Sequence, residues 1–209
     1  MSTETSDVEF DVLHALKVKG LANDEALAAL TGLDAATLTS TIDRLADAGL
    51  VIRRDAGRVS GTMMTPAGRE AHERLAPAFA LDGSALAATE TFHEAFGPIN
   101  ATFKKVCAAW QVRPDGAPND HDDNSYDAAV VADLEAVHEQ VRAALDTVGG
   151  EVPRLGRYRD RLTAALDKVR AGDTAAFARP MYDSYHDIWM ELHQDLLLTS
   201  GRERGAGDE

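Results

Sequence analysis

The chain has 209 residues and a formal net charge of −14, with 44% hydrophobic and 27% charged residues. This composition is that of a globular protein and excludes a largely disordered chain. Because general coating of nucleic acid needs a basic surface, the acidic balance leaves room only for a small, localised nucleic-acid contact. Most of the acidic excess lies after Ala80.

Neither a membrane span nor a secretion signal is predicted. No apolar run approaches the roughly 18 residues of a transmembrane helix, and the polar, acidic first nine residues lack a basic start followed by an apolar stretch. The single cysteine, Cys107, excludes an internal disulfide and lies in an apolar context that favours a buried, inert thiol. The sequence therefore predicts a cytoplasmic protein.

Helical spacing of apolar residues, capping residues and glycine stops define the first 80 residues. Asn23 or Asp24 precedes a short helix as a cap, and Asp34 precedes a longer one. A turn at 55–57 separates two strand-like runs, and Thr65-Pro66 then opens a further helix. The predicted elements are helices 8–19, 25–30, 35–48 and 66–76 and strands 50–53 and 59–64.

The order helix, helix, helix, hairpin, helix is that of a winged helix-turn-helix. The run "LAALTGLDAATLTSTIDRLADAGLVIRR", followed after the hairpin by "TPAGRE", resembles bacterial MarR-type regulators. In such regulators a recognition helix ends in Leu-x-x-x-Gly-Leu-Val, and a Thr-Pro-x-Gly-Arg helix start follows the wing. The resemblance covers roughly residues 8 to 76 and implies a dimeric, DNA-binding transcription regulator.

The remainder of the chain predicts an all-α bundle of long helices with short connections. We expect helices at 85–96, 99–110, 126–148, 155–171 and 174–199, with breaks at Gly97-Pro98 and Gly149-Gly150. The whole chain is therefore predicted to be mostly α. Its expected parts are a DNA-binding domain at 1–80, a helical dimerisation or sensing domain at 84–200, and a flexible tail at 201–209.

The predicted DNA contacts come from the recognition helix and the wing. Leu38, Ile42 and Leu45 recur on one helical face, which we expect to be buried. Hydroxyl and guanidinium groups on the other side would contact phosphates or base edges, and wing arginines would clamp the backbone or enter the minor groove. The predicted DNA-binding residues are Thr37, Ser40, Thr41, Arg44, Arg53, Arg54 and Arg58.

A protein-interaction adaptor that does not bind DNA is the alternative. Asp43 and Asp47 lie on the recognition helix, and their carboxylates oppose phosphates. An adaptor would use the wing as a docking surface for a partner protein. Substituting Arg54 and Arg58 would separate the two hypotheses, since only a regulator would lose DNA affinity.

The C-terminal run "MYDSYHDIWMELHQDLLL" suggests either core packing or the wall of a small-molecule effector pocket. Tyr182, Tyr185, Trp189, Leu192 and Leu196 form a seam on a helix, with two histidines on its edge. The polar loop "NDHDDNSYD" looks like a calcium loop but has Ser125 and Val131 where Gly and Glu are needed, so helix capping is the predicted role. The candidate ligand-binding residues are Asn119, His121, Tyr185, His186, Trp189 and His193.

No cofactor, metal site or catalytic residue is predicted. His186 and His193 are seven residues apart, which is ~10.5 Å along a helix and too far to share one metal ion. A metal or haem sensor would need a further histidine, such as His93 or His138, and a stoichiometric metal or a Soret band would reveal it. Phosphate-binding loops, dinucleotide fingerprints and hydrolase nucleophile motifs are absent from the sequence, which argues against an enzyme.

Overall fold

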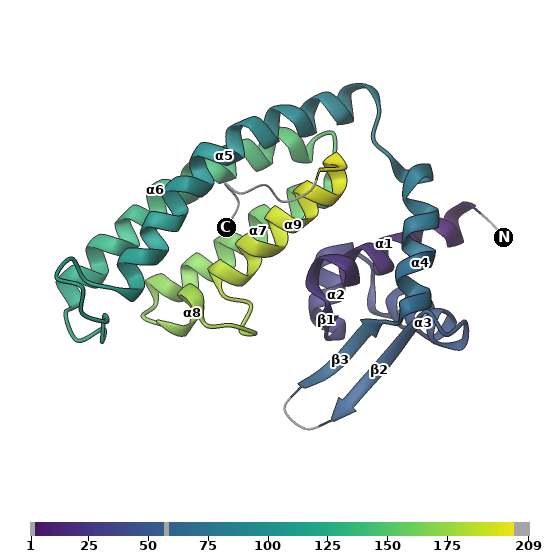
Figure 1. The fold of residues 1–209 in the computed structure, drawn as a ribbon, viewed down its shortest axis with the longest axis horizontal. Helices are drawn as coiled ribbons and strands as arrows, with labels where there is room; N and C mark the ends of the chain where they lie inside the picture. The colour runs from purple at the N-terminus through teal and green to yellow at the C-terminus, as the bar shows by residue number, and fades with distance from the viewer. Residues whose placement is uncertain (1–2, 57–58, 203–209) are drawn as a thin grey trace. The chain divides into compact units, whose positions relative to one another are not determined.

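The computed structural model describes residues 3–56 and 59–202 and is 73% helical. The chain divides into two compact units, Met1–Leu81 and Asp82–Glu209 (Figure 1). The predicted fold class, a mostly helical chain with a small hairpin near its N-terminus followed by a long helical region, is confirmed. None of the described helices is long and apolar enough to cross a bilayer.

The first unit is a three-stranded antiparallel sheet packed with four α-helices. Its strands follow the order β1-β3-β2, so β3 lies between its hairpin partner and a short strand that the sequence did not predict. The core is made by apolar residues of several elements, including Leu13 and Leu16 of the first helix and Ile42. The elements are α1 (Thr3–Lys19), β1 (Leu21–Ala22), α2 (Asp24–Thr31), α3 (Ala35–Asp47), β2 (Val51–Ala56), β3 (Val59–Met64), α4 (Pro66–Leu75) and a 3-10 helix η1 (Ala76–Phe79).

Three predicted helix starts are confirmed by capping hydrogen bonds. Asn23 Oδ1 accepts from the Ala26 amide at 2.8 Å, and Thr65 Oγ1 accepts from the Gly68 amide at 3.1 Å. The carboxylate of Asp34 accepts from two amides at the start of α3. Since each cap satisfies backbone donors that have no partner within their helix, local sequence alone was sufficient to place these boundaries.

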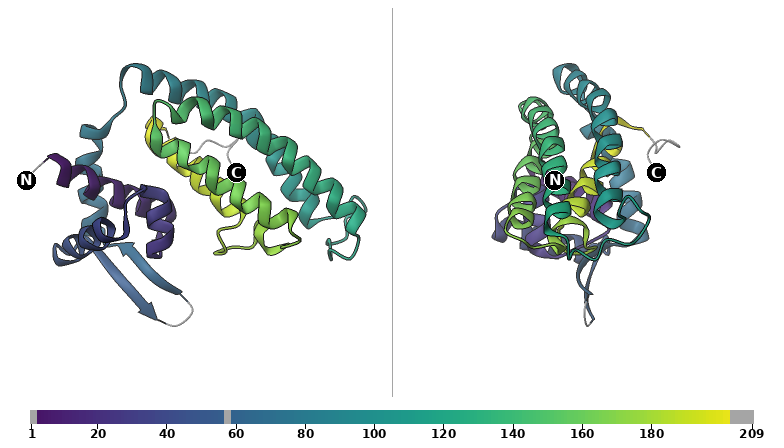
Figure 2. Two further views of the ribbon diagram at one scale, coloured as in Figure 1. Left: turned by 180° about the vertical axis from the view of Figure 1, so that it is seen from behind. Right: turned by 90° about the vertical axis from the view of Figure 1, so that its left-hand side faces the viewer.

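The second unit is a four-helix bundle. Helix α5 packs against α6 and α9, and α7 packs against the same two helices, so the four helices close around one core (Figures 1 and 2). Aromatic rings at every seventh residue of α5 line this core: Phe103 stacks on Trp189 and Trp110 stacks on Phe177, both with centroids 4.2 Å apart. The helices are α5 (Gly83–Gln111), α6 (Asn124–Gly149), α7 (Pro153–Arg170), α8 (Ala175–Ala178) and α9 (Tyr185–Ser200).

The predicted break at Gly97-Pro98 is wrong, because α5 runs through it. A proline inside a helix removes one backbone hydrogen bond and costs about 3 kcal/mol. Phe96 and Ile99 on either side are buried, as is Phe103. Each such side chain contributes roughly 1.5–3 kcal/mol on burial, which outweighs the cost of the proline.

The single helix predicted at 174–199 is also wrong. A short α8 and a separate α9 replace it, and between them Met181 and Asp183 adopt positive φ angles of 58° and 48°. Ser184 then caps α9 by accepting from the Asp187 amide at 3.2 Å. Tyr182 therefore lies outside the helix and is 41% exposed, so it is not part of the predicted seam. The predicted capping role of the polar loop is confirmed, since Asp123 Oδ1 accepts from the Ser125 and Tyr126 amides at the start of α6.

Candidate nucleic-acid interface

Helix α3 occupies the position of a recognition helix and buries one face. The buried residues are Leu38, Thr41, Ile42 and Leu45, which recur at the three- and four-residue spacing of one helical stripe. Thr41 is fully buried. The prediction that Thr41 lies on the DNA-facing side is therefore wrong, because its position continues the inward stripe between Leu38 and Leu45.

The opposite side of α3 brings three of the predicted residues together. Ser40 and Arg44 are exposed, and Thr37 is half-buried. The Thr37 hydroxyl donates to Asp34 Oδ2 at 2.7 Å, while Arg44 Nη1 lies 3.4 Å from Ser40 Oγ. The exposed surface thus combines a hydroxyl with a guanidinium, which are groups that donate hydrogen bonds to phosphates and base edges.

The wing is the hairpin of β2 and β3, with Val51 opposite Met64 and Arg54 opposite Gly61. Gly61 has a φ of 155°, and a Cβ there would lie 2.6 Å from the Ala22 carbonyl oxygen. Only glycine therefore lets β3 pass between its two neighbours at this point. The close fit fixes the wing to the helical part of the unit through β1.

The wing arginines differ in their surroundings. Arg53 Nη1 lies 3.3 Å from Asp24 Oδ1, and Arg53 Nη2 lies 4.0 Å from Asp43 Oδ1. Arg54 is exposed and has no recorded ion pair within residues 3–56 and 59–202. Arg58 lies outside the described residues. The sequence showed these arginines but not their acidic neighbours, since Asp24 precedes Arg53 by 29 positions.

The arrangement of helices, sheet and wing defines the first unit as a winged helix-turn-helix. The model of the MarR family matches residues 5–56. The chain therefore contains a MarR family domain at its N-terminus, and the region that follows it is unassigned. This family is typically a set of non-enzymatic regulators. No curated protein and no solved structure matched the chain.

In the second unit, Asn119 and His121 bind one another and the start of α6. Asn119 Nδ2 donates to Asp127 Oδ1 at 2.8 Å and to the Trp110 carbonyl at 3.1 Å. His121 Nδ1 lies 2.9 Å from Asp127 Oδ2, and its ring packs 4.3 Å from that of Trp110. These contacts hold the loop onto the bundle. They explain the presence of Asn119 and His121 in the loop without a bound ligand.

The other candidate ligand residues are part of the bundle core. Tyr185, Trp189 and His193 are buried, while His186 is half-buried. His193 packs against Phe96, and His186 packs against Phe103 one heptad further along α5. The two histidines thus contact different rings. Within the described residues, no cluster of three or more His, Cys, Asp and Glu side chains could hold a metal ion. A ligand role for these residues stays a prediction.

Cys107 is not a plausible nucleophile in this environment. Burial raises the pKa of its thiol to about 12. Because the thiolate is the reactive form, the side chain stays protonated and unreactive at neutral pH.

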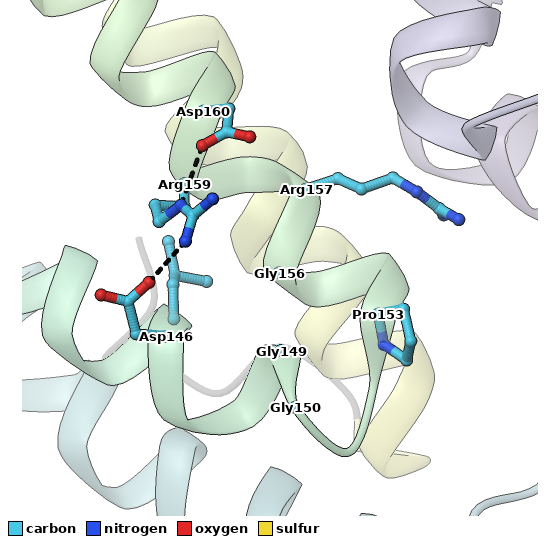
Figure 3. A pocket seen from close by; sticks show the side chains of 9 residues that line it. Asp146, Gly149, Gly150, Pro153, Gly156, Arg157, Arg159 and Asp160 are labelled. Atoms are coloured by element: carbon cyan, nitrogen blue, oxygen red, sulfur yellow. Dashed lines mark hydrogen bonds and ion pairs between the residues drawn. The ribbon is translucent and has the colours of Figure 1, made fainter.

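A surface hollow of about 410 Å³ lies where α6 turns into α7 (Figure 3). Gly149, Gly150 and Gly156 line it with backbone, and Arg159 binds Asp146 and Asp160 at 2.9 and 2.8 Å. None of the candidate ligand residues lines this hollow. Since these acidic and basic groups bind one another, they do not point to a particular ligand chemistry.

Proposed function

We propose that the protein is a sequence-specific, DNA-binding transcription regulator. The observation that carries this proposal is the exposed Ser40–Arg44 face of α3 beside an arginine-bearing wing, within a MarR family domain. In a winged helix-turn-helix the recognition helix enters the major groove, and the hairpin reaches the backbone or the minor groove. In this proposal Ser40, Thr37 and Arg44 contact the major groove, and Arg53, Arg54 and Arg58 contact the phosphate backbone.

The net charge of −14 is compatible with this function. Phosphate contacts are local, and a few guanidinium groups per subunit supply them, while the acidic remainder of the chain discourages indiscriminate binding. Arg54 best fits this role among the wing arginines that the structure describes, because it is exposed and forms no ion pair with the residues in 3–56 and 59–202.

The test is a fluorescence-anisotropy titration of a random duplex pool and of any enriched sequence, from about 50 to 200 mM salt. The R54A/R58A variant should bind every duplex more weakly, and its plot of log affinity against log salt should be shallower by roughly 2 for each subunit bound. Lys105, an exposed residue of α5, provides the control: K105A should match the wild type. Absence of any wild-type binding at low salt would exclude a DNA-binding function.

A protein-interaction adaptor remains the second candidate, because Glu9 lies 3.4 Å from Arg44, and Asp24 lies 3.3 Å from Arg53. These ion pairs reduce the positive potential that a phosphate would meet. An adaptor would show no wild-type DNA binding that depends on Arg54 and Arg58. The same titration therefore decides between the two functions.

For the helical unit we propose dimerisation, effector sensing, or both. A small molecule or partner that binds one conformation better shifts the population and changes the spacing of the two recognition helices, and with it the affinity for DNA. Native mass spectrometry of protein purified directly from cells should reveal a bound small molecule. Protein that is free of ligand and whose DNA affinity is unchanged by metabolite extracts would contradict the sensing role.

A further inference from the structure

Two of the arginines proposed to bind DNA are already engaged by carboxylates of the same unit. Arg44 Nε of α3 lies 3.4 Å from Glu9 Oε1 of α1. Arg53 of β2 binds Asp24 at the start of α2, with Nη1 3.3 Å from both carboxylate oxygens. Asp43 of α3 lies further from the same guanidinium, at 4.0 Å. Each pair joins different elements, so the fold, rather than neighbouring sequence, places the carboxylates.

The guanidinium of each pair is exposed enough to exchange partners. The Arg53 and Asp24 side chains are 44% and 51% exposed, whereas Arg44 is 43% and Glu9 is 16% exposed. Solvent screens the Arg53–Asp24 pair, so that pair contributes little to stability. A DNA phosphate can therefore replace the carboxylate. The phosphate contact is then weaker by the free energy of the ion pair that it has to break.

We propose that Glu9 and Asp24 act as intramolecular competitors of phosphate for Arg44 and Arg53. They weaken binding to every duplex by a similar factor. Only a site that supplies additional base contacts then stays occupied at physiological salt, because non-specific binding rests on the phosphate contacts alone. This inference rests on the proposed function and assigns Glu9 and Asp24 as residues that set the strength of the phosphate contacts.

Asp24 is suited to a clean test, because it does not cap its helix. The side chain of Asn23 accepts the capping hydrogen bond from the Ala26 amide, and it is unchanged in a D24N variant. Asn at position 24 keeps the shape of the side chain but loses the charge. Asp47 provides the matched control: it is an exposed carboxylate of α3 with no cationic partner recorded in the described ranges.

We expect D24N to bind non-specific duplex about two- to five-fold more tightly than wild type, the range that corresponds to an exposed ion pair. D43N should have a smaller effect because its contact is longer, and D47N should show only the effect of the changed net charge. The gain of D24N should shrink as salt is raised from about 50 to 200 mM, because salt screens exposed charges.

A double-mutant cycle shows whether the effect passes through Arg53. In an R53A background D24N should raise affinity no more than D47N does, because no guanidinium is left for the carboxylate to occupy. E9Q and R44A form a second, independent cycle with the same expectation. Circular dichroism and thermal unfolding of each variant show that the fold is retained.

The outcomes separate the two proposals. If wild type and all variants fail to bind duplex DNA, the proposed function fails. If wild type binds but D24N equals D47N, or binds more weakly than wild type, the competitor role is overturned while the DNA-binding function stands. An effect of D24N that exceeds that of D47N even in R53A also overturns the competitor role, because it would not depend on Arg53.

Discussion

The role of several single side chains in this protein depends on contacts with residues that are distant in the sequence. Arg53 is a wing arginine by sequence, but the fold places the Asp24 carboxylate beside it. Thr41 is a polar residue of the recognition helix, but it is fully buried. Its hydroxyl accepts a hydrogen bond from Arg44 Nη2 at 3.3 Å. The structure therefore removes Thr41 from the residues available to DNA. It also places carboxylates beside the arginines, where they oppose the binding of phosphate.

His138 gives a prediction at the same scale. It is buried on α6, where Nδ1 lies 3.2 Å from the Tyr185 hydroxyl and Nε2 lies 3.3 Å from Thr163 Oγ1. Burial lowers the pKa of His138, against a smaller opposing effect of Glu139. The unfolded chain therefore binds a proton at this position more readily than the folded chain does.

The free energy of unfolding should consequently fall as the pH falls below about 6.5, the ordinary value for histidine. An H138Q variant lacks this proton uptake, so its stability should depend less steeply on pH between about 7.5 and 5. Urea denaturation of both proteins across that range measures the two slopes. Equal slopes would mean that His138 does not contribute to the acid sensitivity.

At the scale of elements, helices α6 and α7 come into close contact where Gly149 meets Gly156. A Cβ on Gly156 would lie 2.9 Å from the Gly149 Cα, and backbone cannot move aside as a flexible side chain can. Gly149-Gly150 was predicted only as a break. The structure shows that Gly149 also permits the crossing, because the contact needs a partner glycine on the following helix.

G156A should destabilise the helical unit by about 1–3 kcal/mol, the usual cost of forcing an extra methyl group into a packed contact. Gly97 offers the matched control, since it lies inside α5 and nothing lies within 4 Å of a Cβ there. G97A should stabilise the protein by up to about 1 kcal/mol through helix propensity. Thermal or chemical denaturation should show changes of opposite sign, and a neutral G156A would contradict the close packing.

For the whole molecule, we expect a homodimer in solution. A winged helix-turn-helix contacts one half-site, and two-fold symmetry doubles the contact without adding basic residues to an acidic chain. Sedimentation equilibrium should give twice the chain mass of 22.4 kDa. A protected DNA site should contain two half-sites whose centres are about 10 base pairs, or a multiple of that, apart. A mass of one chain, with and without DNA, would exclude this assembly.

Local sequence determined the helix caps, the hairpin, the mostly helical class and the MarR family resemblance. These features depend on residues that are near one another in the chain: Asn23, Asp34 and Thr65 bond to amides two or three residues further on. The apolar stripe of α3 is likewise a property of spacing. Nothing beyond a few turns of chain was required for them.

Only the tertiary structure decided the continuity of α5 through Pro98, the separation of α8 from α9, and the acidic partners of Arg44 and Arg53. Packing of Phe96 and Ile99 in the bundle outweighs the local cost of a proline, and no local pattern measures that balance. Ion pairs between different elements depend on where the fold brings their side chains. Burial and charge pairing depend on residues that are distant in the sequence, whereas caps and turns depend on residues that are close together in it.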